Sequence, residues 1–170
     1  AAIAANCATA CTPEQAAIWS YPLPEGDEEE TVFNMVNAML LRIHQSGHLN
    51  LLSPERLSLV AEGIQCYYAI REDIKNSLPF WPIGIATMQS EYLCLGMKCD
   101  TAIYLAVWRA KDGDQNTIQI PIADHVMPTN PICIYPSKLE TTYHWDANTS
   151  QFSVTLKPYT ARVFKINLQN

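Results

Sequence analysis

The stretch Gln151-Phe152-Ser153-Val154-Thr155-Leu156-Lys157 decides the fold of the second half of the chain, because apolar and polar residues alternate along it. A period of two places Phe152, Val154 and Leu156 on one face of a β-strand and leaves the other face in water. The same alternation returns at residues 164–168. Turn sequences divide residues 90–170 into about seven strands, the spacing of an antiparallel β-sandwich, and they lie at residues 99–101, 112–114, 128–131 and 146–148.

Before residue 90 the apolar period is helical. The residues Val32, Met35, Val36, Met39, Leu40 and Ile43 recur at the spacing of one helix face, after an acidic first turn at residues 27–30 and before Gly47. A second helix begins at Ser53-Pro54 and extends to Ile74 or Ser77. The aromatic run within residues 13–23 predicts one short strand. The sequence therefore predicts an α+β protein, with one strand and two helices in residues 1–89 and an antiparallel sandwich in residues 90–170.

The composition excludes several classes of protein. The 170 residues are 48% apolar and only 16% charged, with a formal net charge of -6, so the chain is globular and has no basic patch for nucleic acid. No run approaches the roughly 20 apolar residues that span a membrane. Six scattered cysteines without a Cys-x-x-Cys motif predict free thiols and a reducing, cytoplasmic compartment.

Few residues point to chemistry. His44 and His48 have the i, i+4 spacing of a metal pair on a helix, but Gly47 ends the helix between them. We therefore expect a helix-end or packing role, no metal site and no cofactor. Trp19 and Tyr21 differ, since they lie at the end of the predicted strand before a proline-flanked acidic loop. Barrel enzymes place ligand-binding groups at that position, which makes Trp19 and Tyr21 the candidate substrate-binding residues.

An ordered set of segments resembles the C-terminal third of family 36 α-galactosidases, the melibiases. These segments are Pro13-Glu14-Gln15-Ala16-Ala17-Ile18-Trp19-Ser20-Tyr21-Pro22, Leu41-Arg42-Ile43-His44-Gln45-Ser46-Gly47-His48-Leu49, Tyr68-Ala69-Ile70-Arg71, Pro79-Phe80-Trp81-Pro82-Ile83-Gly84 and Tyr104-Leu105-Ala106-Val107-Trp108-Arg109. The closing segment, residues 155–164, resembles the last strands of the β domain that ends many such glycosidases.

The resemblance implies a larger retaining α-galactosidase, with residues 1–89 as the last strand and helices of a (β/α)8 barrel and residues 90–170 as the terminal sandwich. Such enzymes use an aspartate nucleophile and an aspartate acid/base on a terminal α-galactoside oligosaccharide. No position here matches either aspartate motif, so no catalytic residue is assigned and the chain alone is expected to be inactive. The open strand edges and the apolar helix stripe predict that residues 1–89 fold back on the sandwich, self-associate or pack against the rest of the barrel.

Two other readings stay open. A non-catalytic carbohydrate-binding or structural sandwich would present exposed aromatics such as Tyr143 and Trp145 on one sheet face. The same two side chains packed against the helices of residues 30–77 would instead make the sandwich a support for the barrel. A scaffold with no role toward sugar is the third reading.

Overall fold

The computed structural model describes residues 1–122 and 130–168. Its first half contains three α-helices and two paired strands, together with the short 3-10 helices Cys7–Thr9 and Leu49–Leu51. These elements are, in chain order, α1 Ala2–Asn6, β1 Ala17–Ser20, α2 Glu28–Met39, β2 Arg42–Gln45 and α3 Pro54–Lys75. The predicted start of each longer helix is confirmed: Asp27 accepts a hydrogen bond from the Glu30 N–H, and Ser53 accepts one from the Arg56 N–H.

The prediction of a single strand in residues 1–89 was wrong. The first long helix ends at Met39, and residues 42–45 form β2, which pairs in parallel with β1. Ile43 therefore lies on a strand, although its spacing from Val32 also fits a helix face. A run of four residues fits both the helical period of 3.6 and the strand period of 2, so its sequence does not decide between them. The pairing with β1, which is distant in sequence, makes it a strand.

Two antiparallel sheets make up the second half. One has five strands in the order β3-β4-β5-β10-β7, and the other has three in the order β6-β9-β8. Their bounds are β3 Leu78–Phe80, β4 Tyr92–Lys98, β5 Ala102–Arg109, β6 Thr117–Pro121, β7 Ile132–Tyr135, β8 Thr142–Asp146, β9 Gln151–Thr155 and β10 Thr160–Asn167. The described part of residues 90–170 has seven strands, β4 to β10, as expected, and β3, before residue 90, adds an eighth by pairing with β4.

The predicted turns at residues 99–101, 112–114 and 146–148 connect successive strands. The expected turn at 128–131 falls mainly outside the described residues. All six cysteines are free thiols, as expected, but only Cys94 is buried and Cys11 is exposed.

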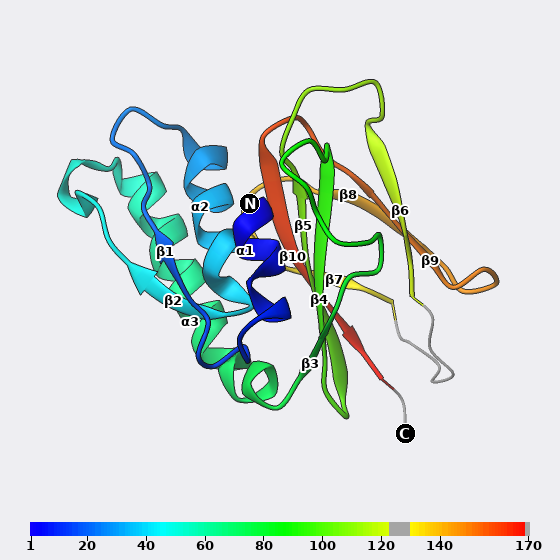
Figure 1. The fold of residues 1–170 in the computed structure, drawn as a ribbon. Helices are drawn as coiled ribbons and strands as arrows, with labels where there is room; N and C mark the ends of the chain where they lie inside the picture. The colour runs from blue at the N-terminus through cyan, green and yellow to red at the C-terminus, as the bar shows by residue number, and fades with distance from the viewer. Residues whose placement is uncertain (123–129, 169–170) are drawn as a thin grey trace.

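Strand β5 separates two hydrophobic cores, because its side chains alternate between the two faces of the five-stranded sheet. Tyr104, Ala106 and Trp108 join the core shared with α2 and α3, whereas Leu105 and Val107 join the core between the two sheets. Every residue of β5 is buried, which explains its continuous apolar sequence. In Figure 1, α1 and α2 lie between the β1–β2 pair and the five-stranded sheet, and the three-stranded sheet covers the far side.

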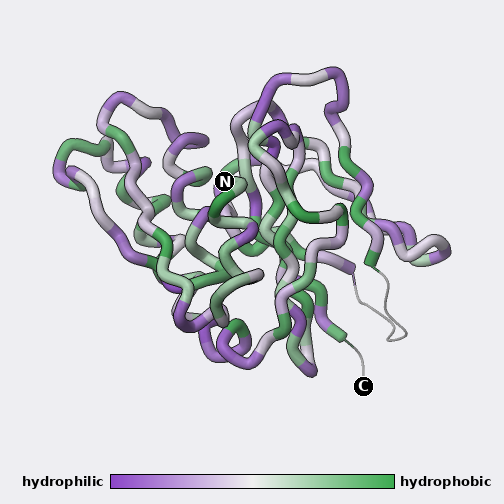
Figure 2. Tube along the Cα trace, in the orientation of Figure 1, coloured by the Kyte–Doolittle hydropathy of each residue, from purple (hydrophilic) through white to green (hydrophobic). Residues whose placement is uncertain are grey.

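The hydropathy of the trace follows these layers. Figure 2 shows apolar residues along the central strands and polar residues along the outer loops, most clearly around the connections of the helical half. Because one core joins residues from both halves of the chain, the helical half packs directly on the β half.

Candidate functional site

One face of the β1–β2 pair is open to solvent and has a mixed aromatic and basic character. Trp19 and His44 are register partners, and their rings meet edge to face with centroids 5.9 Å apart. Arg42 lies two residues before His44, with its Nη2 3.1 Å from the His44 Nε2. We call Trp19, Arg42 and His44 the open face. An exposed indole beside two nitrogen donors is suited to bind a polar, ring-shaped ligand.

The opposite face of the same pair is covered, which fixes the orientation of the open face. Ile18 and Ile43 pack on the helical core, and the buried Ser20 hydroxyl lies 3.1 Å from the Met35 sulfur on α2. Since side chains alternate along a strand, burial of Ile18 and Ser20 turns Trp19 outward. The exposed fraction of the Trp19 side chain is 65%.

Tyr21 begins the loop that joins β1 to α2, and it is 42% exposed. The buried guanidinium of Arg56, on α3, holds this loop by donating to the Pro24 carbonyl at 3.1 Å and to the Leu23 carbonyl at 2.7 Å. It also pairs with Glu30 at 2.9 Å. Arg56 thus sets the path of the chain after Tyr21. Arg56 was not among the residues predicted from the sequence, where the available signal was an arginine in the first turn of a helix with an apolar face.

The other sequence candidates do not form a metal site. His44 lies on β2 and the exposed His48 lies in the following loop, so the expected helix-end role was wrong. Among the described residues, no group of three or more histidine, cysteine, aspartate or glutamate side chains is arranged to hold a metal ion.

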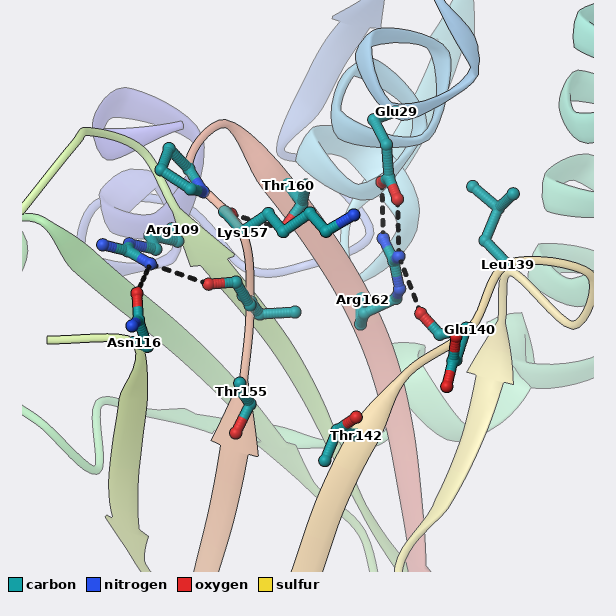
Figure 3. A pocket seen from close by; sticks show the side chains of 12 residues that line it. Glu29, Arg109, Asn116, Leu139, Glu140, Thr142, Thr155, Lys157, Thr160 and Arg162 are labelled. Carbon is teal, nitrogen blue, oxygen red and sulfur yellow. Dashed lines mark hydrogen bonds and ion pairs between the residues drawn. The ribbon is translucent and has the colours of Figure 1, made fainter.

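A separate cavity of about 550 Å³ opens where α2 meets the end of the sandwich (Figure 3). Two buried arginines line it, and both are already bound by the protein. Arg162 donates to both carboxylate oxygens of Glu29 at 2.7 Å, and Arg109 donates to Glu91, Asn116 and main-chain carbonyls. These contacts fix α2 and two loops to the sandwich. They also occupy most of the N–H donors of the two arginines, so few remain to bind a ligand.

Neither arrangement expected for Tyr143 and Trp145 is found. Both lie on β8 opposite Phe152 and Val154, and the Tyr143 ring meets the Phe152 and Phe164 rings at 6.0 and 5.3 Å. Trp145 packs on the same core between the sheets. The two aromatics therefore close the edge of the sandwich core and do not form a flat exposed platform.

Comparison with known proteins identifies the architecture. No family model matches the chain, and no curated protein matches it. Among solved structures, a variant of the family 36 α-galactosidase AgaA from Geobacillus stearothermophilus, in complex with 1-deoxygalactonojirimycin, aligns over 90% of this chain with a TM-score of 0.67 and 5% identity. The chain therefore shares the fold of part of this α-galactosidase.

Two further structures share this fold. The galactosidase domain of the α-galactosidase-sucrose kinase AgaSK aligns over 80% of the chain, with a TM-score of 0.56 and 16% identity. The γ-CGTase of alkalophilic Bacillus clarkii aligns over 90%, with a TM-score of 0.59 and 11% identity. The alignments cover only 22%, 19% and 26% of the AgaA, AgaSK and γ-CGTase chains.

In the described residues, no helix is both long and apolar enough to cross a membrane.

Proposed function

We propose that this chain is the C-terminal part of a retaining α-galactosidase that hydrolyses terminal α-galactosides. Residues 1–89 contribute the last two strands and helices of a (β/α)8 barrel, and residues 90–170 form the terminal β-sandwich. The catalytic aspartates belong to earlier barrel strands, so the 170-residue chain by itself is inactive.

The observation that supports this proposal most strongly is the order β1–α2–β2–α3 with parallel pairing. It corresponds to two consecutive strand–helix units of a barrel, with the helices on one face of the strands. A barrel would place the opposite face, which contains Trp19, Arg42 and His44, toward its interior. The fold likeness to family 36 α-galactosidases adds support.

Within this proposal Trp19 and Tyr21 contact the sugar. They lie at the carboxyl end of β1, where barrel enzymes bind their substrates, and both are exposed in this chain. Their rings supply an apolar face for the pyranose ring, and the tyrosine hydroxyl and indole N–H supply polar edges.

The location and assembly belong to the same proposal. The free thiols support a reducing, cytoplasmic compartment. Among the described strands, β1 and β2 pair only with each other, and their outer edges support docking against the remaining barrel strands or self-association.

The test is hydrolysis of a chromogenic α-galactoside by the 170-residue chain and by a longer protein that adds the preceding barrel strands. We expect activity only in the longer protein. In that protein Trp19→Ala should raise KM at least fivefold, while Tyr68→Ala, which removes an exposed ring from α3, should leave KM unchanged. Activity of the short chain would place the carboxylates within it, and inactivity of both would contradict the proposal.

A further inference from the structure

A second cavity, of about 750 Å³, lies next to the first one and shares Glu29, Lys157, Pro158 and Thr160 with it. The connection between β1 and α2 forms one wall, with Glu25 and Asp27, and Phe33 from α2 continues it. The turn between β9 and β10 forms the other wall with Lys157, Pro158 and Tyr159. This volume lies within the range of small-molecule sites.

The polar groups around the cavity fall into two sets. Asp27, Glu29 and Glu30 are occupied within the protein: Asp27 caps α2, Glu29 binds Arg162 and Glu30 binds Arg56. Among the described residues, by contrast, nothing forms a hydrogen bond or ion pair with the Glu25 carboxylate, the Lys157 ammonium or the Tyr159 hydroxyl. The cavity is thus lined by one hydrogen-bond acceptor, Glu25, one donor, Lys157, and the aromatic ring and hydroxyl of Tyr159, none of which is bound within the described residues.

The backbone of Tyr159 has an uncommon conformation, and its ring is exposed. Tyr159 has φ of 59°, a region that bulky side chains rarely adopt, and its side chain is 58% exposed. More than half of the residue stays in water, so burial of the ring offsets little of this backbone cost. Phe33 and Pro158 line the same cavity and continue the apolar surface.

We propose that this cavity binds a short neutral oligosaccharide, the galactoside substrate beyond its terminal sugar; this rests on the proposed function. The Tyr159 ring stacks on a pyranose face, Glu25 accepts from hydroxyl groups and Lys157 donates to them. The opposite charges of Glu25 and Lys157 disfavour a ligand with net charge of either sign. Glu25 and Tyr21 share one connection and are four residues apart, so their Cα atoms lie no more than about 14 Å apart.

The test is an NMR titration of the 15N-labelled 170-residue chain with stachyose. Amide shifts should change around residues 25–27 and 157–160. Tyr159→Gly removes the ring while glycine adopts the positive φ without strain, so the fold is retained. We expect it to weaken binding at least fivefold and Glu25→Gln to weaken it at least twofold. Tyr68→Ala is the matched control, since Tyr68 is 61% exposed on α3, and it should bind like the unaltered chain.

Two results would overturn this inference. One is the absence of shift changes at these residues at saturating stachyose, which would assign the cavity to another occupant. The other is equal binding by the Tyr159→Gly variant and the unaltered chain. Neither bears on the proposed hydrolysis, which is read from the longer protein with a chromogenic α-galactoside that lacks further sugars. Conversely, loss of that hydrolysis with stachyose binding intact would contradict the proposed function alone.

Discussion

The ion pair between Arg162 on β10 and Glu29 on α2 links the helical half of the molecule to the sandwich. The Arg162 side chain is 4% exposed and that of Glu29 is 31% exposed. Both carboxylate oxygens accept from the guanidinium at 2.7 Å, and the Nε donates to Thr141 at 2.7 Å. Replacing Glu29 by glutamine removes the charge that balances a buried cation and turns one acceptor into a donor that faces it.

The cost follows from these contacts. Removing one partner of a fully buried pair costs about 3–5 kcal/mol, and a hydrogen bond to a charged group contributes about 1.5–3 kcal/mol. Glu29 is about one-third exposed, so water replaces part of the lost interaction. We therefore expect Glu29→Gln to lower the free energy of unfolding by about 2 kcal/mol, which for a chain of this size lowers Tm by about 4–8 °C.

Urea denaturation followed by circular dichroism measures this change, with a thermal scan as the second readout. Glu28→Gln is the matched control, because it makes the same charge change in the same helix turn at an exposed residue and should cost at most about 0.5 kcal/mol. In an Arg162→Met background, Glu29→Gln should cost no more than this control. Equal effects of the Glu29 and Glu28 substitutions in the unaltered chain would refute the reasoning.

Three other measurements test separate parts of the structure. Gly96→Ala should destabilise the chain by about 1–3 kcal/mol in urea, because the added Cβ would clash with the Phe80 ring; an unchanged midpoint would mean that β3 does not pack on β4 as described. Burial raises the pKa of the Cys66 thiol to about 11, so the folded state keeps a proton that the unfolded state loses and stability should fall as pH rises from about 9 to 11. Cys66→Ala should make that decline less steep, and an unchanged slope would contradict the assignment. Trp19→Ala should change the free energy of unfolding of this chain by less than about 0.5 kcal/mol, since the indole is largely in water; a loss above 1 kcal/mol would mean that Trp19 has a packing role.

The candidate site was accessible to sequence reasoning only in part. Trp19 and Tyr21 were identified because an aromatic pair stands between a short apolar run and a proline-flanked loop. His44 was assigned to a helix end, and its contact with Trp19 was missed, because that contact depends on pairing between segments 25 residues apart. Arg56 and Tyr159 were missed for a related reason. The role of Arg56 depends on main-chain carbonyls brought to it by the fold, and that of Tyr159 on its positive φ.

Local sequence determined the elements whose signals are complete within one segment. The Ser53-Pro54 start and the charged and apolar pattern that follows specify α3, and strict alternation specifies β9. A cap, a proline or a period of two acts over a few residues and needs no distant partner.

Tertiary structure alone decided β2 and the assignment of each face of β5. Residues 42–45 contain too few residues for their sequence alone to predict a strand. Strand β5 is apolar on both faces, so the sequence does not show which of its side chains belong to which face. Hydrogen bonds to β1 and burial of Ile43 against the helices stabilise β2, while the two cores divide the side chains of β5 between them. Such choices depend on the free energy of contacts between remote segments, which exist only once the chain has folded.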